Sequence, residues 1–182
     1  MAMVVTSRRS FLSLLSSPCW LPILVSLPVP VVLRSLVQLG APGEAAGDAE
    51  RQLERYLKDM TNQQRVSAGL RSLVWHEKLA QVARAHSADM LARGFFGHRN
   101  PDGADPGRRL EQQGLEFTAW AENLYELTNG PDDPKAVAAS AFRGWMRSSG
   151  HRRNILDGRF RYLGIGVSSR DDSLAFTQLF AA

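Results

Sequence analysis

Three polar residues that lie far apart in the chain could together do chemistry: His98, Glu122 and His151. His98 ends the motif Phe-Phe-Gly-His at 95–98, and Glu122 lies in Trp-Ala-Glu-Asn-Leu at 120–124. Two neutral imidazoles and one carboxylate form a common ligand set for a zinc ion that keeps one position for water. We therefore predict that the three side chains meet in one cleft, with His98 and His151 as candidate metal ligands.

A polar network without a metal is the alternative for the same three residues, because buried polar groups need hydrogen-bond partners. Catalysis has weaker support in the sequence. It shows neither the residue order of a Ser-His-Asp triad nor a cysteine suited to be a nucleophile. His76-Glu77 begins like the helix of a zinc protease, but Ala80 stands where that motif needs its second histidine. The sequence assigns no catalytic residue, and enzyme activity stays open.

Composition excludes some classes of partner. The chain has 182 residues and a net charge of +4, of which the first 45 residues supply three Arg and one Glu. The remaining surplus of two positive charges is too small to indicate a nucleic-acid partner, and no basic stripe with interleaved aromatics is present. Cys19 is the single cysteine, so a disulfide within the chain is impossible.

The N-terminal segment predicts export from the cytoplasm. Thr-Ser-Arg-Arg-Ser-Phe-Leu at 6–12 resembles a twin-arginine signal, and no charge follows before Arg34. An uncleaved membrane anchor is the alternative, since the charge-free stretch is long enough to span a bilayer. Four prolines interrupt that stretch, however, and proline disfavours a helix interior. We predict a signal and linker at 1–45, a domain at 50–182, and a location outside the cell or in the envelope.

The periodicity of apolar residues predicts helices and strands in the domain. The predicted helices are Ala49–Val66, His76–Arg93, Pro106–Gln113, one that opens at Asp133-Pro134, and a short turn at Arg152–Leu156. The predicted strands are Phe117–Tyr125, Tyr162–Ser168 and Leu174–Phe180. This order favours an α+β fold in which helices cover both sides of a small sheet.

Several other polar residues have structural interpretations. His86 lies on the apolar face of its helix and is expected to be buried and hydrogen-bonded rather than a ligand. Asn123 and Asn154 are expected to hold the histidine segments through hydrogen bonds to the backbone.

Seven segments in order resemble one family, the CAP superfamily (cysteine-rich secretory proteins, antigen 5, pathogenesis-related 1), in its bacterial, SCP-like extracellular branch. They include Phe-Phe-Gly-His at 95–98, Ala-Glu-Asn-Leu at 121–124, Ser-Gly-His-Arg at 149–152 and Gly-Ile-Gly-Val at 164–167. The resemblance covers about Leu53 to Phe180. It implies a three-layer α-β-α sandwich with a small antiparallel sheet and a central cleft. Some members hold zinc or magnesium at the equivalent histidines.

The chain departs from the family in ways that affect function. Ser148 stands where many eukaryotic members carry a second acidic residue, and the single cysteine cannot form the disulfides of animal and plant members. The resemblance implies an exported bacterial binding module for a lipid, a small apolar ligand or a cell-wall component. A metal-dependent hydrolase that uses His98, Glu122 and His151 is the alternative, and a purely structural or adhesive domain is a third.

Overall fold

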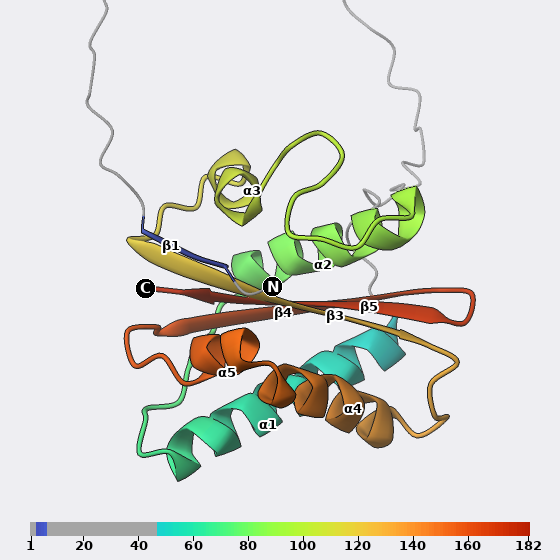
Figure 1. Cartoon of the computed structure of the whole chain (residues 1–182), viewed down its shortest axis with the longest axis horizontal. Helices are drawn as coiled ribbons and strands as arrows, with labels where there is room; N and C mark the ends of the chain where they lie inside the picture. Colours follow the sequence, from blue (N-terminus) through green and yellow to red (C-terminus); the bar gives the residue numbers. More distant parts are fainter. Residues whose placement is uncertain (1–2, 7–46) are drawn as a thin grey trace, which may run out of the picture.

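The computed structural model describes residues 3–6 and 47–182. One sheet lies between two layers of helices, with α2 and α3 on one face and α1, α4 and α5 on the other (Figure 1). The helices are α1 (Asp48–Ser67), α2 (Glu77–Arg93), α3 (Pro106–Gln112), α4 (Pro134–Arg147) and α5 (Ser149–Ile155). The strands are β1 (Met3–Thr6), β2 (Val74–Trp75), β3 (Ala119–Thr128), β4 (Tyr162–Arg170) and β5 (Ser173–Ala181).

The predicted α+β, three-layer α-β-α sandwich is confirmed. The strand order is β1-β3-β5-β4-β2, and all neighbours are antiparallel except β2, which runs parallel to β4. The sequence prediction missed β2 because its two residues are too few to show an alternating pattern. His76, Asp105 and Asp133 cap α2, α3 and α4 with their side chains. Aspartate is a common residue at this position.

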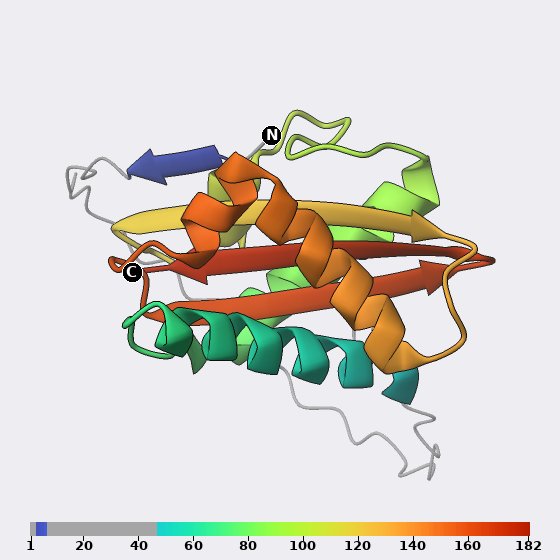
Figure 2. The ribbon, with the colours of Figure 1, turned by 60° about the horizontal axis from the view of Figure 1, so that its bottom comes forward.

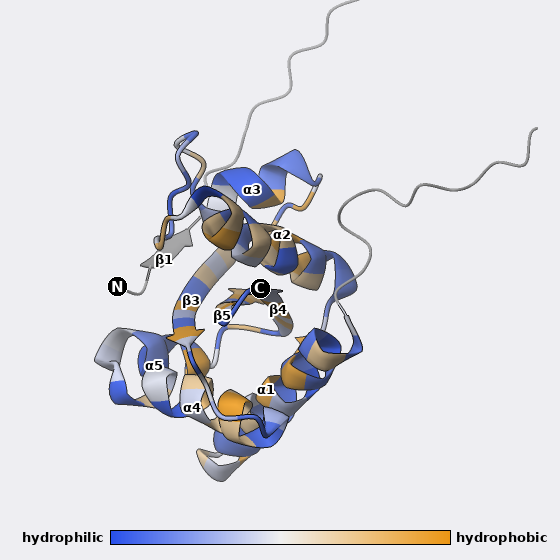
Figure 3. Ribbon diagram, turned by 90° about the vertical axis from the view of Figure 1, so that its right-hand side faces the viewer, coloured by the Kyte–Doolittle hydropathy of each residue, from blue (hydrophilic) through white to orange (hydrophobic). Residues whose placement is uncertain are grey.

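Successive residues of β3 face opposite layers, as the pleat of a strand requires. Ala119 and Ala121 pack with α1 and α4 in the larger core cluster, whereas Trp120 packs with residues of α2 and α3. Figure 2 shows α4 crossing the strands obliquely and α1 running along them on the side of Ala119 and Ala121. Figure 3 shows the hydrophobic sides of both helices turned toward the sheet. Glu122 therefore faces the α2–α3 layer and Asn123 the opposite one.

Helix α2 lies unusually close to β4 because two glycines leave room for it. A Cβ atom at Gly166 would lie 2.0 Å from the backbone nitrogen of Arg84, and one at Gly164 would lie 2.4 Å from that of Ala80. Such distances are far below van der Waals contact, so only glycine fits. This contact fixes α2, and with it the start of the loop that carries His98.

Residues 7–46 hold most of the predicted export signal and linker, including Cys19, and lie outside the described residues. Among the helices at 47–182, none combines the length and the apolar character needed to cross a bilayer.

Candidate functional site

A buried carboxylate joins two segments of the α2–α3 layer. Glu122 is 0% exposed, and its Oε1 lies 2.8 Å from Nδ1 of His98. Its Oε2 accepts a hydrogen bond of 2.7 Å from Nη2 of Arg109 in α3. An unpaired carboxylate would be costly to bury. Arg109 neutralises this charge, so Glu122 can be buried here because the arginine lies next to it.

Arg109 also shapes the loop between α2 and α3. Its Nη1 donates to the carbonyl oxygens of His98 at 2.9 Å and Ala104 at 3.0 Å. Gly94 ends α2 with a φ of 66°, a left-handed conformation that suits glycine, and the chain then turns back toward β3. One guanidinium therefore holds both the carboxylate and the backbone of the residue that contacts it.

The contact with Glu122 decides the tautomer of His98. A carboxylate accepts hydrogen bonds, so Nδ1 carries the proton and donates it. In neutral imidazole, Nε2 then has the lone pair and can accept a hydrogen bond or bind a metal ion. The side chain of His98 is 16% exposed, compared with 0% for Glu122. The imidazole is thus the part of this cluster that reaches toward solvent.

His86 supports the loop from below. Its Nε2 donates to the carbonyl oxygen of Gly97 at 3.0 Å, and the side chain is buried, as predicted. The pKa of His86 is lowered to about 4, mainly by burial. Arg109 also lowers it, and the nearby Glu122 opposes the shift. The imidazole is therefore neutral near pH 7, and it fixes the residue that precedes His98.

His151 is the third residue of α5, and a network of side-chain amides reaches its backbone. Asn123 donates to the carbonyl oxygen of His151 at 3.1 Å and to Oε1 of Gln178 at 2.9 Å. Asn154 donates to Oδ1 of Asn123 at 2.9 Å. The prediction that Asn123 holds a histidine segment through its backbone is therefore confirmed. Ser148, at the place of the second acidic residue, instead caps α5 by accepting a hydrogen bond from the His151 amide.

The structure thus brings His98 and Glu122 together, and it places the backbone of His151 beside the next residue of β3. The convergence of the His151 ring with those two side chains stays a prediction. Sequence reasoning missed Arg109. A glutamate within a buried apolar strand indicates that a cation lies next to it, because an unpaired buried charge is costly. The sequence does not say which cation, since Arg99, Arg108 and Arg109 were equal candidates.

The residues around Glu122 do not fit a zinc centre with three protein ligands. Both carboxylate oxygens are engaged, and one of them lies 2.7 Å from a guanidinium that would repel a bound cation. In the described ranges 3–6 and 47–182, no three His, Cys, Asp or Glu side chains are grouped so as to hold a metal ion. Zinc or magnesium held by His98 and His151 alone stays a prediction.

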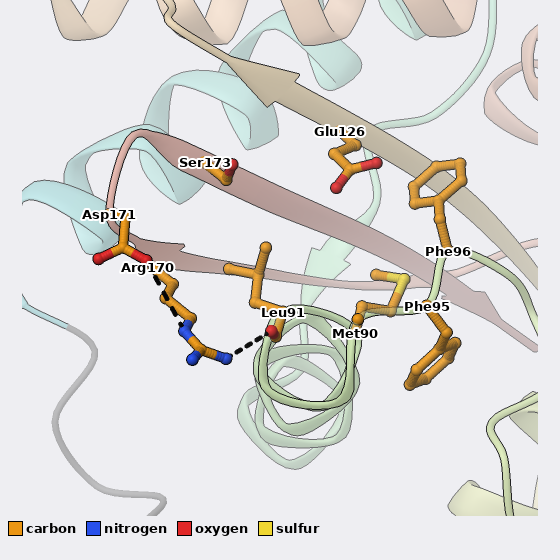
Figure 4. Close-up of a pocket in the computed structure, with 9 residues that line it drawn as sticks. Met90, Leu91, Phe95, Phe96, Glu126, Arg170, Asp171 and Ser173 are labelled. Carbon is orange, nitrogen blue, oxygen red and sulfur yellow. Dashed lines mark hydrogen bonds and ion pairs between the residues drawn. The ribbon is translucent and has the colours of Figure 1, made fainter.

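A pocket of about 370 Å³ lies on the same side of the sheet, near the C-terminal end of α2 (Figure 4). Phe96 is 52% exposed at its edge, and Met90, Leu91 and Phe95 add apolar surface. Arg170 donates to the carbonyl oxygen of Leu91 at 2.9 Å, so its guanidinium caps the C-terminal turn of α2. The lining is therefore mixed: apolar side chains lie beside charged ones, and polar atoms make up more of its accessible surface than apolar atoms.

Comparison with known proteins gives consistent matches. The model of the cysteine-rich secretory protein family, CAP, matches residues 58–180. An uncharacterized membrane protein of Bacillus subtilis, YlbC, is 34% identical over 128 residues, which are 70% of this chain and 34% of that protein. The chain spans about a third of the length of this relative, so what the rest of it does is not carried over.

Solved structures show the same fold. An extracellular protein with an SCP domain from Bacillus anthracis matches with a TM-score of 0.62 and 32% identity, over 72% of this chain and 41% of that one. An outer surface protein of Borrelia burgdorferi matches with a TM-score of 0.58 and 17% identity, over 74% of this chain and 95% of that one. The second likeness is one of fold alone.

Proposed function

Because the chain belongs to the cysteine-rich secretory protein family, we propose that it is an exported binding module of the bacterial envelope or the extracellular space. Its ligand is a cell-wall component that contacts His98. The similarity to an extracellular SCP-domain protein supports the location. The predicted export signal at 1–45 is part of the same proposal.

The observation that carries the proposal is the pair of contacts that Glu122 makes with His98 and Arg109. A fully buried carboxylate between His98 and Arg109 orients one imidazole and leaves that imidazole partly exposed. An imidazole held in one orientation can hydrogen-bond to hydroxyl or amide groups, which glycan and peptide parts of a cell wall offer in number. Both oxygens of Glu122 are already engaged, so neither is placed to activate water, which favours binding over hydrolysis.

Co-sedimentation with purified peptidoglycan tests this proposal. The His98→Gln variant should lose binding by about tenfold or more, since it replaces an oriented imidazole with a flexible amide. His76→Asn is the matched control, because it removes another imidazole while asparagine keeps the capping role at the start of α2. Equal binding by the wild type and His98→Gln would refute the proposal.

A small apolar ligand is a second candidate, favoured by the pocket at Phe96 (Figure 4). Phe96 and Met90 give this pocket of about 370 Å³ an apolar patch, and a small-molecule site usually combines such a patch with a few polar groups. The two candidates separate by mutation. Phe96→Ser should weaken the binding of a fluorescent fatty acid and leave peptidoglycan binding unchanged, and His98→Gln should do the reverse.

The metal prediction has its own test. Zinc and magnesium titration of the wild type and of the double variant His98→Ala with His151→Ala measures whether these histidines hold an ion. Equal metal binding by both proteins would end the prediction. The binding proposal does not depend on that result.

A further inference from the structure

The outer edge of β3 presents backbone hydrogen-bonding groups next to the site. The amide and carbonyl of Ala119 both bond to Ala182, on the β5 side. Because these groups alternate in direction along an antiparallel strand, those of Trp120 and Glu122 point the other way, to the outer edge. Side-chain bonds agree, since Asn154 and Trp145 donate to the carbonyl oxygens of Glu122 and Leu124.

Among the strands at 3–6 and 47–182, only β1 pairs with this edge. Met3–Thr6 run antiparallel to Ala119–Glu122, with Met3 opposite Glu122 and Val5 opposite Trp120 (Figure 1). The four residues of β1 lie outside the part of the chain that matches the family, at 58–180. They come from a remote segment, the one predicted to be an export signal. The edge thus belongs to the domain, whereas the strand that covers it, Met3–Thr6, comes from outside the domain.

Exposed edges of this kind bind extended peptides, because the backbone supplies the hydrogen bonds whatever the side chains are. Met-Val-Val-Thr is rich in residues that favour strands. The indole of Trp145 already occupies the carbonyl of Leu124 at 3.1 Å, so the available stretch ends near Glu122. The docking site is therefore short and adjacent to His98.

We propose that the outer edge of β3 at Ala119–Glu122 is a binding site for an extended peptide strand, and that Met3–Thr6 is its built-in competitor. Removal of the N-terminal segment uncovers the edge. A bound strand would lie directly beside the His98–Glu122 contact. The inference goes beyond the proposed function, since it depends on backbone groups of β3 and not on the imidazole.

Proline substitution in the full chain tests the competitor. Val5 is opposite Trp120, and the backbone groups of Trp120 face β1. The amide of Val5 therefore points to β3, and Val5→Pro removes the hydrogen bond that this amide donates. The amide of Val4 points away, and Val4→Pro is the matched control. Amide hydrogen exchange followed by NMR should show Trp120 and Glu122 exchanging about tenfold faster or more in Val5→Pro than in Val4→Pro. Equal exchange in the two variants would contradict the competitor.

A synthetic peptide tests the site. The hexapeptide Ala-Met-Val-Val-Thr-Ser, residues 2–7, should restore slow exchange at Trp120 and Glu122 when added to Val5→Pro. Its affinity should be about tenfold higher or more for Val5→Pro than for the wild type, whose edge is already covered. A copy N-methylated at the residue equivalent to Val5 should not bind, while one methylated at the residue equivalent to Val4 should.

Three results would overturn the proposal. The peptide could protect no amide of β3, or the two methylated copies could act alike. Val5→Pro could also form a dimer in sedimentation velocity, with Trp120 and Glu122 protected before any peptide is added, which would assign the edge to a second copy. The peptidoglycan test reads His98 and this one reads the Trp120 and Glu122 amides, so either can fail alone.

Discussion

Two neighbouring residues of β3 anchor polar networks of opposite character. On the α2–α3 side, Glu122 belongs to a charged cluster with Arg109 and His98. On the other side, Asn123 belongs to a neutral chain of amides with Asn154 and Gln178. The charged cluster ends at a side chain that is 16% exposed, whereas every member of the neutral chain is 0% exposed.

The difference separates a site from its scaffold. The neutral amide chain ties β3, α5 and β5 together and also reaches α1, because Gln178 donates to Thr61 at 2.9 Å. It needs no outside partner. The charged cluster needs Arg109 to be stable and presents His98 outward. One strand therefore serves ligand contact on one face and rigidity on the other. The predictions below test this division.

The largest effect is expected when the charged cluster loses its anion. Glu122→Leu leaves Arg109, only 9% exposed, as a buried cation without its carboxylate. Breaking a buried ion pair in this way costs about 3 to 5 kcal/mol of unfolding free energy, measurable by urea denaturation. Adding Arg109→Met to Glu122→Leu should recover part of that loss. A double variant no more stable than the single one would show that the ion pair is not what holds this layer.

The charged side should also respond to acid. The pKa of His86 is lowered from 6.5 to about 4 by burial. Between these values His86 binds a proton in the unfolded chain but stays neutral in the folded chain. This stabilising contribution is fully present above pH 6.5 and is lost as the pH falls toward about 4. The wild type should lose about 3 kcal/mol more over this range than His86→Phe, which does not titrate at this position. Parallel pH profiles for the two proteins would contradict the prediction.

The neutral network predicts a smaller loss with a different signature. Asn123→Leu removes the donor to the His151 carbonyl and to Gln178, and it removes one of the two acceptors of Asn154. Unsatisfied buried groups cost about 1 to 3 kcal/mol each, and relaxation toward water should keep the total near 2 to 3 kcal/mol. Because no charge is involved, the loss should be the same at pH 5 and pH 7. A loss that varied with pH would mean that the two networks are coupled across the sheet.

The sequence was sufficient to predict the layers and the strand that carries Glu122 and Asn123. Helix caps, glycine ends and the alternation of β3 are local patterns, so they can be recognised without the fold. Motif order supplied the pairing of His98 with Glu122, which are 24 residues apart. The choice of Arg109 over its neighbours could not be predicted, because it depends on how α3 packs on β3.

Two other features were also beyond the sequence. Strand β2 has too few residues for a period, and its pairing with β4 comes from the path of the chain between α1 and α2. The pairing of Met3–Thr6 with β3 joins segments more than a hundred residues apart. Such contacts follow from which edge the completed fold leaves open.

The smallest change in stability should come with the largest change in binding. His98→Gln acts at the exposed end of the charged cluster, where Glu122 keeps its bond to Arg109. The loss in unfolding free energy should therefore stay below about 1 kcal/mol, as for a partly exposed hydrogen bond. Peptidoglycan binding should nevertheless fall, because the oriented imidazole is gone. A His98→Gln protein destabilised as strongly as Glu122→Leu would place the imidazole in the scaffold, and the distinction between the two faces of β3 would then fail.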